Sequence, residues 1–167
     1  MHVRLLCFAV MALLAAVVLG PTAAHAQGPT RPPTVEAVLA DYELIRAALA
    51  RDDGEGVAEP ARRIVRHVEG GLASTAPAYR ARLAQASSEA RRLSGLDPAD
   101  LVELRHAFGE LSRALVALLQ EQPTLTEGLH VFECPMTSGY GRWVQRTRTT
   151  SNPFMGGRMP MCGRRVN

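Results

Sequence analysis

Apolar residues recur at steps of three and four between residues 35 and 118, and this spacing constrains the fold more than any other feature. Such a period places the apolar side chains on one face of a helix. It is interrupted by turn-forming residues at 52–54, 70–71 and 94–95. The pattern therefore predicts four amphipathic helices, over residues 35–51, 57–72 and 76–93, with a fourth that begins at Pro98 and ends before Gln122-Pro123.

Residues that favour helix starts support these boundaries. We expect Thr34, Thr75 and Asp97 to be N-caps, because their side-chain oxygens accept hydrogen bonds from the first free backbone N–H groups. Proline is well tolerated at a first helical position, as predicted for Pro98. The pair Asp52-Asp53 is compatible with a metal site or a catalytic dyad. We interpret it instead as a turn that also caps the following helix.

The fourth helical segment carries apolar residues in a seam of nearly three heptads, which is typical of packed antiparallel helices. Short connections join all four segments. The predicted fold class is therefore all-α, an up-down four-helix bundle over residues 34–122. The seam consists of Leu101, Leu104, Phe108, Leu111, Leu115 and Leu118.

Residues 123–167 differ in character and form a predicted small irregular or β-hairpin element. Residues 129–133 and 140–148 read as short strands, and residues 149–163 read as a loop with three glycines and two prolines. A segment of this size cannot bury enough surface to fold alone. We therefore expect the element, which contains the cysteines and methionines described below, to pack on the bundle.

The N-terminus has the features of a secretory signal peptide over residues 1–26. Arg4 precedes an apolar run, and Ala24-His25-Ala26 supplies small residues at a cleavage site. Residues 27–33 hold three prolines and read as a flexible leader. The sequence thus predicts a periplasmic or otherwise exported protein that is soluble after cleavage, with no membrane span in the mature chain.

Charge and motifs exclude several functions. The whole chain has 19 basic and 16 acidic residues, and loss of Arg4 with the leader leaves 18 and 16, a net charge of +2. That balance argues against a nucleic-acid partner. The chain has no Cys-x-x-Cys motif, no Gly-rich phosphate loop and no His-Glu-x-x-His motif. We therefore expect no enzymatic activity and no catalytic residues.

Sulfur-containing residues cluster in the C-terminal element. Both cysteines that follow the leader, Cys134 and Cys162, lie between Glu133 and Gly163, together with four methionines and the only tryptophan, Trp143. Thiolates and thioethers are soft ligands suited to Cu(I) or Ag(I). Two cysteines in an exported chain are also the minimum for one disulfide.

Two strings in this element resemble a known family. They are Cys134-Pro135-Met136 and Asn152-Pro153-Phe154-x-Gly156-x-x-Met159-x-x-Cys162-Gly163, with Trp143 between them. They resemble an uncharacterised bacterial periplasmic domain found alone or fused to adaptor subunits of copper/silver efflux pumps. The resemblance implies heavy-metal handling, with an efflux adaptor or a metal chaperone as partner. Arg164-Arg165 replace an acidic residue that relatives tend to have after Cys-Gly.

Two interpretations of the cysteines follow. In the first, the chain is a periplasmic accessory protein for metal efflux or resistance, and it binds Cu(I) or Ag(I). The predicted ligands are Cys134, Met136, Met159 and Cys162, with His130 and Met161 as further candidates. In the second, a Cys134–Cys162 disulfide fixes the C-terminal element of a non-catalytic interaction module. The sequence leaves both open.

Overall fold

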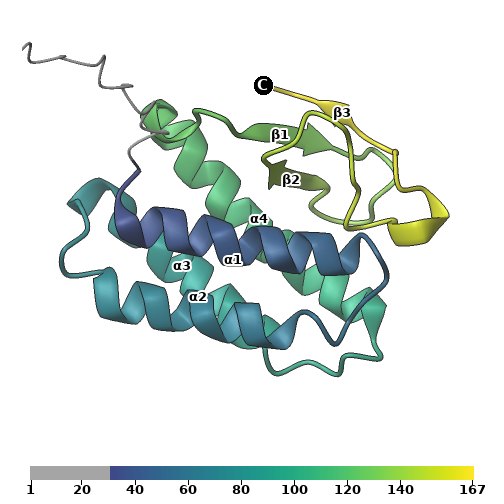
Figure 1. Cartoon of the computed structure of the whole chain (residues 1–167), viewed down its shortest axis with the longest axis horizontal. Coiled ribbons are helices and arrows are strands. Elements are labelled where there is room, and N and C mark those ends of the chain that lie inside the picture. The colour runs from purple at the N-terminus through teal and green to yellow at the C-terminus, as the bar shows by residue number, and fades with distance from the viewer. Residues whose placement is uncertain (1–30) are drawn as a thin grey trace, which may run out of the picture.

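The computed structural model describes residues 31–167 and contains four helices followed by a small sheet (Figure 1). The helices are α1 (Pro33–Leu49), α2 (Ala58–Gly71), α3 (Pro77–Leu93) and α4 (Leu101–Glu121). Each helix packs on the next, as the sequence predicts, and their apolar faces share one core. No helix in the described range is long and apolar enough to cross a membrane. The predicted signal peptide lies outside the described residues.

All four helices begin at a different residue from the predicted one, α2 by a single residue, at Ala58. Helix α1 begins at Pro33 and α3 at Pro77, since a proline at the first helical position lacks only an N–H that has no helical partner. Helix α4 begins at Leu101, where the side chain of Asp100 accepts a 3.0 Å hydrogen bond from Glu103 N. Asp97 instead caps a preceding turn, in which its Oδ1 accepts from Ala99 N.

The predicted leader is not free along its whole length. Arg31 is buried, and its Nε donates a 2.7 Å hydrogen bond to the carbonyl oxygen of Leu125. Its other nitrogens bind the Glu36 carboxylate and the carbonyl oxygen of Glu127. The carbonyl oxygens of Leu125, in the 3-10 turn after α4, and of Glu127, just beyond it, therefore anchor the chain where it enters α1.

The C-terminal element is a three-stranded antiparallel sheet in the order β2-β1-β3. Strands β1 (His130–Glu133) and β2 (Arg142–Gln145) form the predicted hairpin, with Val131 opposite Val144. Strand β3 (Arg164–Arg165) was not predicted; it pairs with the end of β1, where Glu133 lies opposite Arg164. The element is therefore larger than a hairpin. Two 3-10 turns, Pro123–Leu125 and Gly156–Arg158, lie before and after the first two strands.

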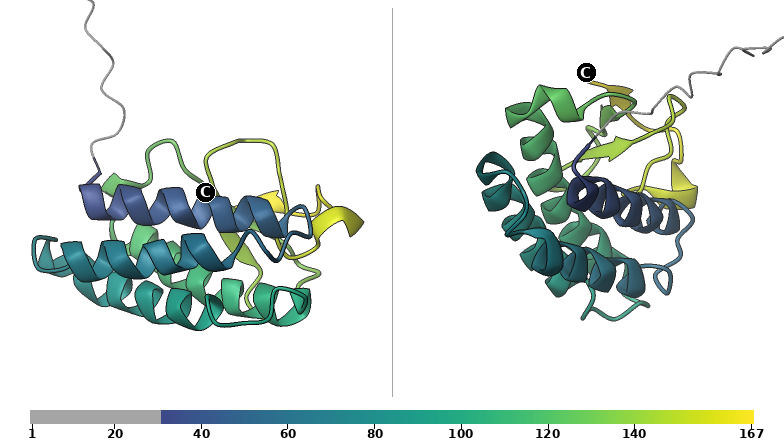
Figure 2. Two further views of the ribbon diagram at one scale, coloured as in Figure 1. Left: turned by 60° about the horizontal axis from the view of Figure 1, so that its bottom comes forward. Right: turned by 60° about the vertical axis from the view of Figure 1, so that its left-hand side comes forward.

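The sheet lies over α4 and beside α1 (Figures 1 and 2). Strand β2 packs directly on α4, and its aromatic and aliphatic side chains join the helical core. Gly109 of α4 permits this approach, because a Cβ there would lie 3.1 Å from the carbonyl oxygen of Tyr140. Helices and sheet thus form one continuous core, as expected of an element that cannot fold alone.

Candidate functional site

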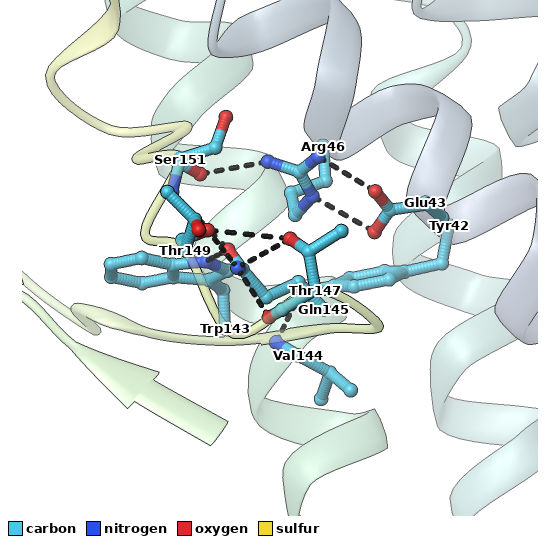
Figure 3. Close-up of polar contacts among 9 residues, drawn as sticks. All are labelled: Tyr42, Glu43, Arg46, Trp143, Val144, Gln145, Thr147, Thr149 and Ser151. Atoms are coloured by element: carbon cyan, nitrogen blue, oxygen red, sulfur yellow. Dashed lines mark hydrogen bonds and ion pairs between the residues drawn. The ribbon is translucent and has the colours of Figure 1, made fainter. Parts of the chain in front are cut away.

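The sheet is joined to α1 by a buried polar network (Figure 3). The hydroxyl of Tyr42 accepts a 3.2 Å hydrogen bond from Val144 N and lies 2.7 Å from Ser112 Oγ of α4. Arg46 of α1 donates to the carbonyl oxygen of Ser151 at 2.7 Å. Burial raises the pKa of Tyr42 far above its ordinary value, so this hydroxyl stays protonated.

Gln145 holds the chain after β2 in place (Figure 3). It is fully enclosed, and its Oε1 accepts a 2.9 Å hydrogen bond from the indole of Trp143. Its Nε2 donates to the carbonyl oxygens of Thr147 and Thr149, at 2.8 and 2.7 Å. The Gln145 side chain therefore fixes the turn that precedes the loop carrying the predicted ligands Met159 and Cys162.

Aromatic side chains pack beneath the segment that ends in Cys162 and Gly163. Trp143 has no exposed surface; it stacks on Phe132 at 5.5 Å between ring centroids and meets Phe154 edge-on at 6.0 Å. Gly163 lies against this ring with φ of +140°, and a Cβ there would lie 2.6 Å from Trp143 Cη2. Trp143 is thus an anchor, and the glycine after Cys162 is required by the close approach.

Asn152 positions the second cysteine. It is fully buried, and its Oδ1 accepts hydrogen bonds from Phe154 N and Met155 N, at 2.7 and 3.1 Å. Its Nδ2 donates a 2.6 Å hydrogen bond to the carbonyl oxygen of Cys162. The Asn-Pro-Phe string therefore has a structural role, which is to close the 152–162 loop.

The two cysteines are brought together. Cys134 follows β1 at the base of a loop closed by a 2.9 Å hydrogen bond from its N to the carbonyl oxygen of Gly141. Its Sγ lies 3.0 Å from Sγ of Cys162, and both are free thiols. Cys134 is 3% exposed, whereas Cys162 is partly accessible. The structure thus places these two predicted ligands within contact distance.

The pKa values of the two thiols are shifted in opposite directions. Burial alone raises the pKa of the Cys134 thiol, but hydrogen bonds from Cys162, Thr137 and the N–H of Met136 outweigh burial and lower this pKa. The same contact raises the pKa of Cys162. The Thr137 hydroxyl oxygen is buried and forms no hydrogen bond with a nitrogen or oxygen of the described residues. Cys134 is therefore the first of the pair to become a thiolate.

The methionines have different environments. Met136, Met159 and Met161 are 64%, 43% and 60% exposed, respectively. Met155 instead packs against the core. The three exposed thioethers contribute little to packing, and each lies within three residues of Cys134 or Cys162 in the sequence.

The other predicted donors lie in less favourable surroundings. His130, at the start of β1, has its pKa lowered by partial burial and by the nearby charges of Arg165 and Arg148. Two cations there disfavour a bound metal cation. Arg164 pairs with Glu133 at 2.7 Å, so its charge is balanced beside Cys134. Residues 31–167 hold no cluster of three or more histidine, cysteine or acidic side chains arranged for a metal ion.

Asp52 contributes to the fold of the C-terminal element. It has a left-handed backbone (φ of 58°), and its carboxylate binds Arg105 of α4 and accepts a 2.9 Å hydrogen bond from Gly157 N. These contacts, that with Gly157 first, lower the pKa of Asp52. Asp53 accepts a hydrogen bond from Gly56 N at 2.9 Å. The acidic pair does lie in a turn, and Asp52 is also joined to a distant loop. The predicted capping of α2 is wrong, because its N-cap is Val57 and no side chain caps it.

No family model, curated protein or solved structure matches the chain.

Sequence reasoning missed three residues that build the site: Thr137, Gln145 and Asn152. All three are polar residues in or beside loops, where such residues are usually exposed. Only Asn152 had a signal, since asparagine before proline favours a turn. Their roles depend on partners that the fold brings close.

Proposed function

We propose that this chain binds Cu(I) or Ag(I) through Cys134 and Cys162, with Met136 and Met159 completing the ligand set. The observation that carries the proposal is the 3.0 Å contact between the two sulfurs, which also lowers the pKa of the Cys134 thiol. A thiolate is the form that binds metal. Two cysteine sulfurs in contact, with methionines two and three residues from them in the sequence, offer the soft ligands that such ions prefer.

Packing supports this assignment by accounting for the other residues of the motif. Trp143, Asn152 and Gly163 are fixed by hydrogen bonds and close contacts. The Tyr42 and Gln145 networks and the aromatic cluster also join the element to the helices without using the cysteines. The exposed methionines Met136, Met159 and Met161 do not pack against the core. Sulfur chemistry is therefore the remaining explanation for these side chains.

The distance between the sulfurs suits a bound ion after a small movement. With metal–sulfur bonds of about 2.3 Å, two ligands of one ion lie roughly 3.8 to 4.6 Å apart, for tetrahedral to linear arrangements. The sulfurs must therefore separate by about 1 Å or slightly more. The Cys162 side chain is partly accessible and is free to make this movement by a change of rotamer.

The proposed biological role is that of an exported accessory protein in metal efflux or resistance, without catalytic activity. It rests on the motif resemblance and on the predicted signal peptide. A periplasmic efflux adaptor or metal chaperone is the proposed partner. We also infer an up-down bundle for the four helices, which the short connections and the packing of consecutive helices support.

A second candidate function follows from the same contact. A disulfide has sulfurs about 2.05 Å apart, so closure by about 1 Å would cross-link Cys134 and Cys162. The burial of Cys134 also suits a structural bond. In that case the chain is a non-catalytic interaction module with a fixed C-terminal element.

Competition for Cu(I) with bicinchoninate, under anaerobic conditions, tests the first proposal. We expect the reduced chain to remove one Cu(I) from the chelator. Cys134→Ser or Cys162→Ser should weaken binding by at least about 100-fold, and Met136→Leu with Met159→Leu by about 10-fold. Met155→Leu is the matched control and should leave the affinity unchanged.

Two outcomes separate the candidates. If the reduced chain takes no copper from micromolar chelator, metal binding is refuted. If thiol titration of protein from the periplasm finds no free thiol, and mild reductant releases none, the disulfide module is the correct interpretation.

A further inference from the structure

A cavity of about 420 Å³ lies on α4 beside the loops that carry Met136 and Met155. Its size falls within the usual range for small-molecule pockets. Val102, Met136 and Met155 line an apolar part, and Arg105, Ser138 and Arg158 provide polar groups. Glu103 also lines the cavity, and its carboxylate is paired with Arg92. Val102 is 80% exposed although it is apolar. The cavity therefore offers both an apolar surface and guanidinium groups to one ligand.

Hydrogen bonds to two backbone carbonyl oxygens and to one carboxylate hold the Arg105 side chain in position. Its Nε donates to the carbonyl oxygen of Pro153 at 3.0 Å, and its Nη2 donates to that of Leu49 at 3.1 Å and to Asp52. Only 13% of the side chain is exposed. Its Nη1 has no hydrogen-bond partner within residues 31–167, and the residue lines the cavity. A fixed donor of this kind binds a ligand with little loss of conformational entropy.

Arg158 supplies a second guanidinium. Most arginines of the described chain form ion pairs with carboxylates, whereas the Arg158 side chain forms no salt bridge or hydrogen bond with any described residue. Arginine binds carboxylates through parallel, charge-assisted hydrogen bonds. The two guanidiniums also disfavour a metal cation at this place.

We propose that this cavity binds a small organic carboxylate with an apolar body. The carboxylate binds Arg158 and the free Nη1 of Arg105, and the apolar body packs against Val102, Met136 and Met155. This site shares Met136 with the proposed metal site but none of the cysteines, so carboxylate binding does not require free thiols.

Titration of the purified chain with 4-phenylbutyrate, followed by amide and methyl NMR shifts, tests the proposal. We expect saturable shifts at Arg105, Ser138 and Met155, with a Kd of about 1 mM or tighter. The neutral amide, 4-phenylbutyramide, should bind at least about fivefold more weakly. Arg158→Gln should weaken binding of the carboxylate about three- to tenfold. This exposed side chain forms no hydrogen bond or salt bridge with a described residue, and its charge acts on Asp52 only at longer range.

Arg148→Gln is the matched control, because Arg148 is also exposed and unpaired among the described residues but does not line the cavity. It should bind the carboxylate as the parent chain does. Absence of saturable shifts up to about 10 mM overturns the proposal. Equal affinity for acid and amide also overturns it, as does unchanged binding by Arg158→Gln.

Discussion

Replacement of Tyr42 by phenylalanine tests whether buried hydrogen bonds, and not the cysteines, hold the C-terminal element. The substitution removes one oxygen and leaves the stacking of the ring on Phe108, with centroids 5.1 Å apart. It leaves Val144 N and Ser112 Oγ without their partner, and both groups are buried. An unsatisfied buried donor costs about 1–3 kcal/mol.

We expect Tyr42→Phe to lower the free energy of unfolding by about 2–3 kcal/mol. The loss is smaller than the sum for two unsatisfied groups, because the deleted hydroxyl no longer needs to be desolvated. Urea denaturation of the fully reduced chain measures this change, and the urea dependence should stay constant if the folded state is unchanged. Ser112→Ala should cost about 1 kcal/mol. The double variant should cost less than the sum, because both changes break the same hydrogen bond.

Tyr79→Phe is the matched control. Tyr79 is a partly buried residue of α3 whose hydroxyl forms no hydrogen bond within the described chain, so the change should stay within about 0.5 kcal/mol. A loss below about 0.5 kcal/mol for Tyr42→Phe would refute the reasoning. It would mean that this network does not secure the sheet when the thiols are reduced.

Two further predictions concern the turns that support the site. Asp52 has a lowered pKa when folded, so its stabilising contribution is present above pH 4 and lost as pH falls below its unfolded value of about 3.9. Asparagine tolerates the same left-handed backbone, so Asp52→Asn should cost only about 0.5–1 kcal/mol at pH 7. The free energy of unfolding of this variant should also fall less steeply as the pH drops below about 4; an unchanged slope would contradict this. Gly163→Ala should cost more than about 2 kcal/mol in thermal denaturation, because a Cβ meets Trp143; Gly128→Ala, with φ of 67° in open space, isolates the backbone strain of about 1 kcal/mol. Equal losses at the two glycines would contradict the predicted clash.

Local sequence determined the helices and the hairpin. The apolar period and the turn residues gave all four helices, because a helix needs only neighbours in sequence to define its buried face. The helix starts were misplaced by one to three residues because several capping residues compete within one turn. Thr75, for example, donates to the carbonyl oxygen of Gly71 and does not cap α3. The clustering of sulfur in residues 134–162 was also plain from the sequence.

Tertiary structure decided how these parts meet. Strand β3 pairs with residues about thirty positions earlier, and its two arginines carry no strand pattern of their own. Arg31 and Asp52 look like ordinary surface residues until the fold supplies carbonyl and amide partners from distant segments. The contact between Cys134 and Cys162 likewise depends on the sheet register and on Asn152. The proposed ligands Cys134 and Cys162 were visible in the sequence, but the distance between their sulfurs follows from long-range packing.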